Sequence, residues 1–418
     1  MTRIKLGYGK NGLFIDIPNA DIISPRHQES LSDPEKAIKN KLYNPNFGKS
    51  LEQILSGKST VAISFTDITR ATPNNIIIPV LIGELRKCGI AKNNIVLINM
   101  TGSHRHETTE ELSRRLGKDI VANYRIVQHN SFDKSSMTLA GYMGNQYPLY
   151  INSDFMAADV KICTGFIEPH FFAGFSGGPK AVLPGLSDID SIMRNHNAVR
   201  IGDKNATWGI TIGNPVWENI REGCSIVNPD FLINVALNSD AKITEIFTGE
   251  WEKAHQAGYT YVKANAMCKV NKLYDTVITT NSGYPLDMNL YQCVKGLSAA
   301  AEIVKDNGTI IIAGECSDGI PYGSSYQKIL GMEKTPEKLF DLIISNPIVI
   351  PEQWQVQIQT KIQKRAKVYI YSDYLSDEEI KASLLLPCRN IEALVNELSG
   401  DVAILPEGPQ AIPYLDNK

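Results

Sequence analysis

The sequence lacks the patterns that mark secreted, metal-finger and membrane proteins. Its seven cysteines are scattered, with no Cys-x-x-Cys pair and no metal-finger spacing. This usage predicts a reducing compartment rather than a disulfide framework. The first residues lack the apolar core of a signal peptide, and no apolar run is long enough to span a membrane. These absences predict a cytoplasmic protein without a membrane partner.

The chain also lacks an excess of charge of one sign. Its formal net charge is −3 over 418 residues, so composition gives no reason to expect a nucleic-acid partner. A hydrophobic content of 43% and a charged content of 21% are typical of a globular protein. The length is sufficient for two domains.

Apolar β-prone runs alternate with helical patterns in the first part of the chain. Thr60–Phe65 and Ile95–Met100 lie on either side of a helical pattern at Asn74–Cys88, and Val160–Phe166 is a further apolar run. A strand, a helix and a second strand in this order imply a parallel sheet. An earlier pair of short strands, residues 3–7 and 13–17, predicts a hairpin.

The same rhythm begins again near residue 270. Strands are predicted at Asp275–Thr280, Thr309–Ala313, Lys367–Tyr371 and Val402–Leu405, with helices between them. We therefore expect an α/β protein with two Rossmann-like α/β domains and the active site in the cleft between them. The expected division is an N-terminal cofactor-binding domain at 1–268 and a C-terminal domain at 269–418.

The stretch Glu168–Gly185 combines residues that packing alone does not require. His170 and Lys180 lie on either side of a Gly-Phe-Ser-Gly-Gly turn, just after an apolar run. Glycines at this density allow the backbone to approach a ligand closely. The lysine amine can bind a phosphate or be covalently modified, and the histidine imidazole can transfer a proton or bind a metal. The stretch is not a Walker A loop, because Pro179 precedes the lysine and Ala181 replaces the Mg²⁺-binding hydroxyl residue. It predicts an active site.

Another polar group follows the strand at Thr60–Phe65. Asp67, Thr69 and Arg70 come at the turn from this strand into the next helix. Ligands of open α/β sheets bind past the carboxyl ends of strands, and an arginine there can hold a carboxylate or phosphate. The alternative is an ordinary Asp/Thr helix cap with a solvated arginine.

Three histidines follow predicted strands or lie near them. His104 comes after Gly102 at the end of Ile95–Met100, and His170 and His196 follow the strand Val160–Phe166. Together they could bind zinc, although the sequence has no H-E-x-x-H motif. The other histidines are expected at the surface: His27, His106, His129 and His255.

The second half contributes one further polar cluster. Tyr291, Gln292 and Lys295 lie near the start of a helix predicted at Asp287–Val304. Residues four apart share a helix face, so the phenol and the ammonium could hold a small carboxylate. The alternative is a solvated helix face.

Five motifs occur in order along nearly the whole chain. They are Asp67-x-Thr69-Arg70-x-x-Pro73; Gly102-x-His104-Arg105; Glu168-Pro169-His170-Phe171-Phe172-Ala173-Gly174 with Gly177-Gly178-Pro179-Lys180; Asn195-His196-Asn197; and Tyr291-Gln292-x-x-Lys295. Together they resemble the nickel-dependent lactate racemase family of 2-hydroxyacid racemases and epimerases. Family members often have proline where this chain has His106, which bears on substrate preference.

The resemblance implies a cofactor, a nickel-pincer pyridinium-bis(thio acid) mononucleotide. By analogy Lys180 is covalently tethered to it through a thioamide, and His196 supplies the protein ligand to nickel, which suits square-planar Ni(II). The resemblance also implies maturation enzymes as partners. The residues expected to bind the cofactor's phosphate are Asp67, Thr69, Ser176, Gly177 and Gly178.

The resemblance further implies racemisation of a small 2-hydroxy acid, with lactate favoured, by reversible hydride transfer to the cofactor. His104 and His170 are the expected acid/base pair, one for each face of the flat 2-keto acid. Arg70, Tyr291, Gln292 and Lys295 are expected to hold the substrate.

Other functions remain open at this stage. The substrate could be malate, a longer hydroxy acid or a sugar acid. Lys180 could instead form a Schiff base with pyridoxal phosphate, or the three histidines could bind zinc for hydrolysis. A binding protein without enzymatic activity is a further alternative.

Overall fold

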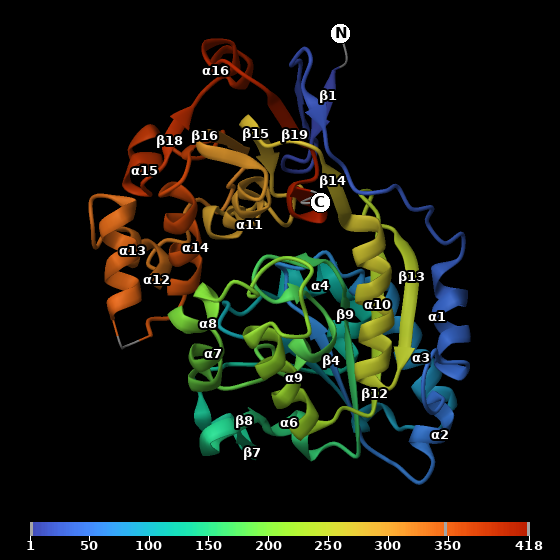
Figure 1. The fold of residues 1–418 in the computed structure, drawn as a ribbon. Coiled ribbons are helices and arrows are strands. Elements are labelled where there is room, and N and C mark those ends of the chain that lie inside the picture. Colours follow the sequence, from blue (N-terminus) through green and yellow to red (C-terminus); the bar gives the residue numbers. More distant parts are fainter. Residues whose placement is uncertain (1–2, 347–348, 416–418) are drawn as a thin grey trace.

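The part of the chain that the structure describes contains two large sheets, each of six strands. The computed structural model describes residues 3–346 and 349–415 (Figure 1). The first sheet has the order β13-β12-β9-β4-β5-β6, and all its pairs are parallel except β12 with β13. Its strands are β4 (Val61–Thr66), β5 (Ile95–Met100), β6 (Arg125–Gln128), β9 (Val160–Phe166), β12 (Phe231–Leu237) and β13 (Ile243–Gly249).

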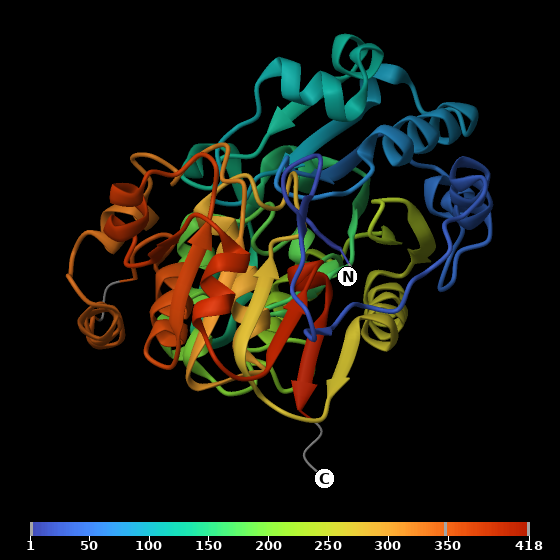
Figure 2. The ribbon, with the colours of Figure 1, turned by 90° about the horizontal axis from the view of Figure 1, so that it is seen from above.

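The second sheet is parallel throughout and has the order β18-β17-β16-β15-β19-β3. Its strands are β3 (Asp21–Ile22), β15 (Tyr274–Thr280), β16 (Val304–Ala313), β17 (Lys367–Tyr371), β18 (Leu386–Cys388) and β19 (Val402–Leu405). Figure 2 shows from above the half that contains this sheet, in orange to red, beside the blue and teal elements of the first half. The predicted α/β class with parallel sheets is confirmed.

The helices pack against the two sheets (Figure 1). They are α1 (Pro34–Tyr43), α2 (Leu51–Leu55), α3 (Asn74–Lys87), α4 (Thr109–Leu116), α5 (Lys118–Asn123), α6 (Ser153–Ala157), α7 (Ile189–Asn195), α8 (Ala198–Gly202), α9 (Pro215–Val227), α10 (Trp251–Ala266), α11 (Leu290–Ala301), α12 (Ser325–Leu330), α13 (Pro336–Ser345), α14 (Gln353–Gln363), α15 (Asp377–Ala382) and α16 (Ile391–Glu397). Among the residues described, no helix combines the length and the apolar character needed to cross a membrane.

Each strand predicted above has its counterpart in the structure, but one helix is shorter than expected. The helix predicted at Asp287–Val304 is α11, Leu290–Ala301. Asn289 caps its start, because its side chain accepts the N–H of Gln292. At the other end Val304 already belongs to β16. The shortening leaves Tyr291 and Gln292 in the first turn, near the cavity described below.

The N-terminal segment lies with the second sheet, not the first. The predicted hairpin is present as β1 (Ile4–Leu6) and β2 (Leu13–Ile15), and β3 pairs with β19. Leu6 shares a buried cluster with Ile278 and Ile404 of the second sheet, and Figure 1 shows β1 next to β19. The division at residue 268 stays a prediction, and residues 4–23 pack with the later half.

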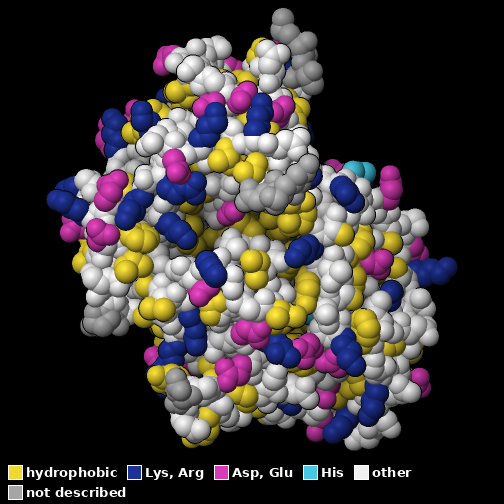
Figure 3. All heavy atoms as spheres, viewed as in Figure 1, with side chains coloured by type: hydrophobic (Ala, Val, Ile, Leu, Met, Phe, Trp, Pro, Cys, Tyr) yellow, Lys and Arg dark blue, Asp and Glu magenta, His cyan; other side chains and the backbone are white. Residues whose placement is uncertain are grey.

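Among the described residues, four two-stranded pairings accompany the two large sheets, and β1–β2 is one of them. The others are β7 (Met137–Met143) with β8 (Tyr147–Asn152), β10 (Pro169–His170) with β11 (Gly174–Phe175), and β14 (Met267–Val270) with β20 (Ile412–Leu415). The face in Figure 3 carries acidic and basic side chains interspersed, as expected from the small net charge. The short β10–β11 pair lies directly after β9 and forms one wall of the candidate site.

Candidate active site

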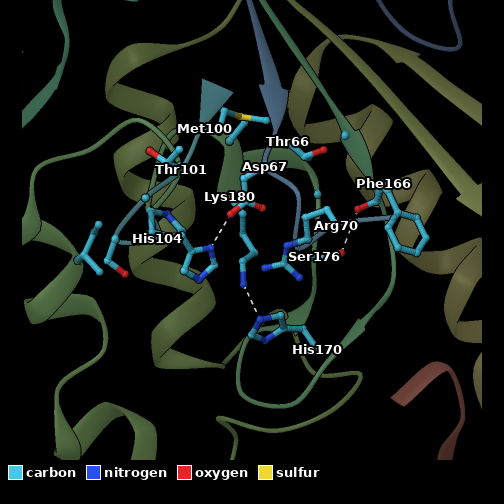
Figure 4. Close-up of a pocket in the computed structure, with 18 of the residues that line it drawn as sticks. Thr66, Asp67, Arg70, Met100, Thr101, His104, Phe166, His170, Ser176 and Lys180 are labelled. Atoms are coloured by element: carbon cyan, nitrogen blue, oxygen red, sulfur yellow. Dashed lines mark hydrogen bonds and ion pairs between the residues drawn. The ribbon is translucent and has the colours of Figure 1, made fainter. Parts of the chain in front are cut away.

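A cavity of about 120 Å³ lies where the carboxyl ends of β4, β5 and β9 meet α11 and α14. The switch point of an open parallel sheet is the usual place for a ligand. All but one of the predicted site residues line this cavity. They are Asp67, Arg70, His104, His170, Ser176, Gly177, Gly178, Lys180, His196, Tyr291, Gln292 and Lys295. Figure 4 shows several of them around the side chain of Lys180.

Asp67 follows β4 and serves His104. Its Oδ2 lies 2.5 Å from His104 Nδ1, and its Oδ1 accepts the hydroxyl of Thr69 at 2.8 Å. Burial alone would raise the pKa of the Asp67 carboxyl, but the charge and hydrogen bond of His104, with smaller contributions from Arg70 and Thr69, lower this pKa to about 2. Asp67 is therefore ionised. Thr69, the predicted residue that does not line the cavity, supports Asp67 from behind.

His104 is directed by its neighbours into the cavity. Gly102, at φ +55°, turns the chain after β5, and its N–H bonds the carbonyl of Gly185. Because Asp67 accepts the Nδ1–H of the imidazole, Nε2 carries the lone pair and can take a proton from a ligand. This arrangement suits a general base.

His170 has a different partner. Its Nε2 lies 2.8 Å from Lys180 Nζ, and its Nδ1 accepts the N–H of Ala173 at 3.3 Å. Its ring packs on those of Phe171 and Phe172. Burial, followed by the charges of Lys180 and Arg70, lowers the pKa of His170 well below its usual value. The imidazole is therefore neutral in this structure.

The glycine turn between His170 and Lys180 is tightly packed against β12 and α10. A Cβ on Gly178, which has φ +51°, would lie 2.2 Å from the ring of His255. The Gly178 N–H donates to Asn234 Oδ1 at 2.7 Å, and His255 Nε2 bonds the Ser176 carbonyl at 3.0 Å. Ser176 Oγ accepts the N–H of Glu168. The Ser176 hydroxyl and the Gly178 N–H thus have partners within the protein.

Two histidines expected at the surface are buried, so that expectation is wrong for them. His255 is 1% exposed and His129 is fully buried. Each bonds a backbone carbonyl, of Ser176 and Ser187 respectively. Burial is the main cause that lowers the pKa of His255 to about 4, so this ring is a neutral support of the turn. His27 and His106 are exposed as expected.

His196 caps the end of α7 and presents one free ring nitrogen. Its Nδ1 bonds the Ile192 carbonyl at 3.1 Å, which fixes the proton on Nδ1 and leaves Nε2 with its lone pair. Burial, and then the charge of Lys180, lowers the pKa of His196 to about 3. Its ring lies 4.6 Å from that of Trp354. A neutral imidazole with a free Nε2 is a good metal ligand.

The three histidines do not form a zinc site. Within the described ranges, no three His, Cys, Asp or Glu side chains gather in a way that could hold a metal ion. His170 is occupied by Lys180, and His104 by Asp67. The zinc-hydrolase alternative therefore lacks its ligand set, and a metal bound by His196 would need other donors.

The helix α11 turns its polar residues inward, which excludes the solvated-face alternative. Tyr291 is 8% exposed and Gln292 3% exposed. The Tyr291 hydroxyl accepts the indole N–H of Trp354 at 2.9 Å, so its own proton is available to a ligand. The Gln292 Oε1 is buried without a hydrogen-bond partner. Burial and the charge of Arg70 lower the pKa of Lys295 to about 7.

Arg70 is held by a residue to which sequence reasoning gave no role. Glu168 Oε1 pairs with Arg70 Nη1 at 2.9 Å, and Glu168 Oε2 accepts the amide of Gln410 at 3.0 Å. Trp354 and Gln355 of α14 also line the cavity and were not predicted. No strand end or motif signals these α14 residues, whereas Glu168 lies inside a quoted motif.

Comparison with known proteins places the whole chain in one family. The lactate racemase N-terminal domain model matches residues 8–209, and the lactate racemase C-terminal domain model matches residues 270–407. The chain is 35% identical to the lactate racemase of Thermoanaerobacterium thermosaccharolyticum, over 99% of both chains. It is 33% identical to that of Lactiplantibacillus plantarum, over 98% of this chain and 99% of the relative.

Solved structures agree with this placement. The lactate racemase apoprotein from T. thermosaccharolyticum superposes with a TM-score of 0.90 at 34% identity, covering 99% of this chain and 100% of that one. A protein from Thermotoga maritima, at 16% identity, has a TM-score of 0.72 over 91% of this chain and 98% of its own. The second likeness shows that the fold is shared.

Proposed function

This chain belongs to the lactate racemase family, a family of isomerases, and we propose that it interconverts the two enantiomers of lactate. The observation that carries the proposal is that His104 and His170 line one small cavity together with Arg70 and Lys295. Two bases and two cations are what a reversible reaction of a small hydroxy carboxylate needs.

The cations suit the substrate's carboxylate. Arg70 uses Nη1 for Glu168, and its other N–H donors remain for a ligand. Lys295 faces the same cavity, and the Tyr291 hydroxyl can donate a further hydrogen bond. These groups would hold the carboxylate while the rest of the molecule turns.

The histidines move the hydroxyl proton. His104 Nε2 has a lone pair because Asp67 holds Nδ1, so it takes the proton from one enantiomer. We assign the other enantiomer to His170, whose Nε2 also faces the cavity. The α-hydrogen of a 2-hydroxy carboxylate is very weakly acidic, and the nickel-pincer nucleotide, when bound, supplies an acceptor that takes this hydrogen with its electron pair and returns it. Phe172 and Trp354 contribute apolar walls to the cavity beside these polar groups.

The chain's own residues fit this cofactor. Lys180 places a primary amine in the cavity, the group needed for a thioamide tether. His196 offers a neutral Nε2 to nickel, since Ile192 holds its Nδ1 proton. Within the described residues, protein donors for a complete metal site are absent, which agrees with a metal whose remaining ligands come from the cofactor. Maturation enzymes of the host would supply it.

The test is to purify the chain from its native host, then measure its intact mass, its bound nickel and its action on each lactate enantiomer. We expect a mass excess that maps to the Lys180 peptide, about one nickel per chain, and conversion of either enantiomer to the racemic mixture. An unmodified Lys180 with zinc or no metal would remove the cofactor part of the proposal. A loaded chain that racemises malate or a longer hydroxy acid, but not lactate, would keep the reaction class and overturn the substrate.

A further inference from the structure

Three basic side chains face one small cavity. Arg70, Lys180 and Lys295 all line the cavity of about 120 Å³. The nearby carboxylates already have partners, since Glu168 pairs with Arg70 and Asp67 with His104. Within the described residues, neither lysine makes an ion pair with a carboxylate. Three positive charges at this density, partly removed from water, repel one another.

The hydrogen bonds of His170 show which group gives up its charge. Its Nδ1 accepts the Ala173 N–H, so the single proton of the neutral ring is on Nε2. That proton points at Lys180 Nζ, 2.8 Å away. An ammonium would place its own hydrogens against it, whereas a neutral amine offers a lone pair. The geometry is therefore consistent with a neutral Lys180.

We propose that the chain without cofactor keeps Lys180 as a neutral, nucleophilic amine ready for acylation, because Arg70 and Lys295 exclude a third charge and His170 directs an N–H at its lone pair. Arg70, Lys295 and His170 then have a second role, before any substrate binds. The inference deepens the proposed function, in which Lys180 is the attachment point of the cofactor, and it concerns the unloaded protein only.

The electrostatics agree with the geometry. Burial, followed by the charges of Arg70 and Lys295, lowers the pKa of Lys180 well below its usual value. A lysine beside another cation is a known way to obtain a nucleophilic amine at neutral pH. The charged or titratable groups around Lys180 are His170, His196, His255, Arg70, Lys295 and Glu168.

A small acyl donor tests this directly, and acetic anhydride is the probe. The Lys180 nitrogen attacks one carbonyl carbon, the new C–N bond forms, and the C–O bond to the leaving acetate breaks. The proton lost by the amine leaves with the acetate as acetic acid. The experiment treats the full-length unloaded chain at pH 6 to 9 and follows acetylation of each lysine by peptide mapping.

We expect acetylation of Lys180 at pH 6 to 7 to be at least about tenfold faster than that of Lys58, an exposed lysine in the same digest. The rate at Lys180 should change little with pH, while an ordinary lysine gains roughly tenfold per pH unit. In Lys295→Gln, acetylation of Lys180 at pH 6 should fall at least about threefold and converge with the wild-type rate at pH 9. Lys58→Gln removes the same charge just before the N-terminal end of β4, whereas the cavity lies at the carboxyl end of this strand. This control variant should leave the acetylation rate of Lys180 unchanged.

Equal rates and equal pH slopes at Lys180 and Lys58 would overturn the inference, as would a Lys295→Gln profile that matches the wild type. Near-UV circular dichroism of each variant shows whether its fold is intact, and ¹⁵N NMR of histidine reads the His170 tautomer independently. A ring protonated on Nδ1 would also overturn it. No turnover is measured, so failure here leaves the racemase proposal standing, and failure to racemise lactate leaves this result unchanged.

Discussion

His104 and His170 lie in the same cavity, but their partners are opposite in chemistry. His104 shares Nδ1 with the ionised carboxylate of Asp67, whereas His170 shares Nε2 with the amine of Lys180. The carboxylate fixes the ring so that Nε2 can take a proton, and it stabilises the resulting charge. The amine occupies the nitrogen that His170 would use. The unloaded chain therefore has one base ready. His170 can act as the second base only when Lys180 no longer accepts its Nε2 proton and this proton moves to Nδ1, which now accepts the Ala173 N–H.

The largest expected effect is the loss of either histidine. We expect His104→Gln and His170→Gln each to lower kcat for lactate by roughly 10²–10⁴. Both directions should fall together, because a catalyst cannot change the equilibrium between enantiomers. Chiral chromatography of lactate after incubation with each loaded variant measures this. Bound nickel is the control for loading. A variant with full nickel and wild-type kcat would contradict the proposal that His104 and His170 act as the acid/base pair.

A smaller effect is expected from the partner of His104. Asp67→Asn removes the charge that orients the imidazole and stabilises its cation, so kcat should fall by roughly 10² with KM little changed. The split between kcat and KM, measured with nickel content, decides between two roles for Asp67. If the variant loses bound cofactor while the loaded fraction keeps its kcat, Asp67 serves the cofactor, as the sequence analysis predicts, and not His104.

Much of the site could be predicted because its residues follow strands. Apolar runs at Ile95–Met100 and Val160–Phe166 are visible in the sequence, and parallel strands bring their carboxyl ends to one edge. The polar residues after them, among them His104 and His170, therefore had to lie close together. The environment that separates their roles could not be predicted, because the Lys180–His170 contact depends on how the glycine turn folds back.

The remaining features of the site and fold could not be predicted, because they depend on contacts between residues far apart in the sequence. Asn234 and His255 support the glycine turn from β12 and α10, about 55 to 80 residues further along the chain, and carry no motif. Trp354 of α14 reaches the cavity only because α14 packs on α11. The two-residue strand β3 pairs with β19 across the whole chain, and no local pattern could indicate this. In each case the partner is fixed by tertiary packing.

The two sides of the site also differ in how closely the backbone is packed, which Gly178→Ala tests. His104 follows a regular strand, whereas the turn before Lys180 fits only because Gly178 has no Cβ to meet His255. We expect this variant to lose about 2 kcal/mol or more of unfolding free energy, from the positive φ and the contact together. Urea unfolding measures it. Gly57→Ala is the matched control, since Gly57 has φ +71° with nothing within 4 Å, and it should lose only about 1 kcal/mol. Equal losses would remove the contact with His255 as a cause.

The smallest expected effect concerns Lys295, which both sides of the site share. Its pKa of about 7 in the empty cavity lies below the usual value, so its positive charge is lost as pH rises through this range. Arg70, Glu168, Asp67 and Cys293 are the charged or titratable groups that face it. Because the cation holds the carboxylate, KM for lactate should rise a few-fold, and at most about tenfold per pH unit, from pH 6 to 8.

Lys295→Arg should remove this dependence, since a guanidinium stays charged throughout the range. The measurement is KM and kcat of the loaded wild type and of the loaded Lys295→Arg variant at each pH. The loss of the Lys295 charge with rising pH would appear in KM. A wild-type KM that stays flat from pH 6 to 8, or a variant KM that rises like the wild type, would show that the charge of Lys295 does not set the pH dependence of KM. Lys295 would then act only on Lys180, where its positive charge keeps the Lys180 amine neutral before the cofactor binds.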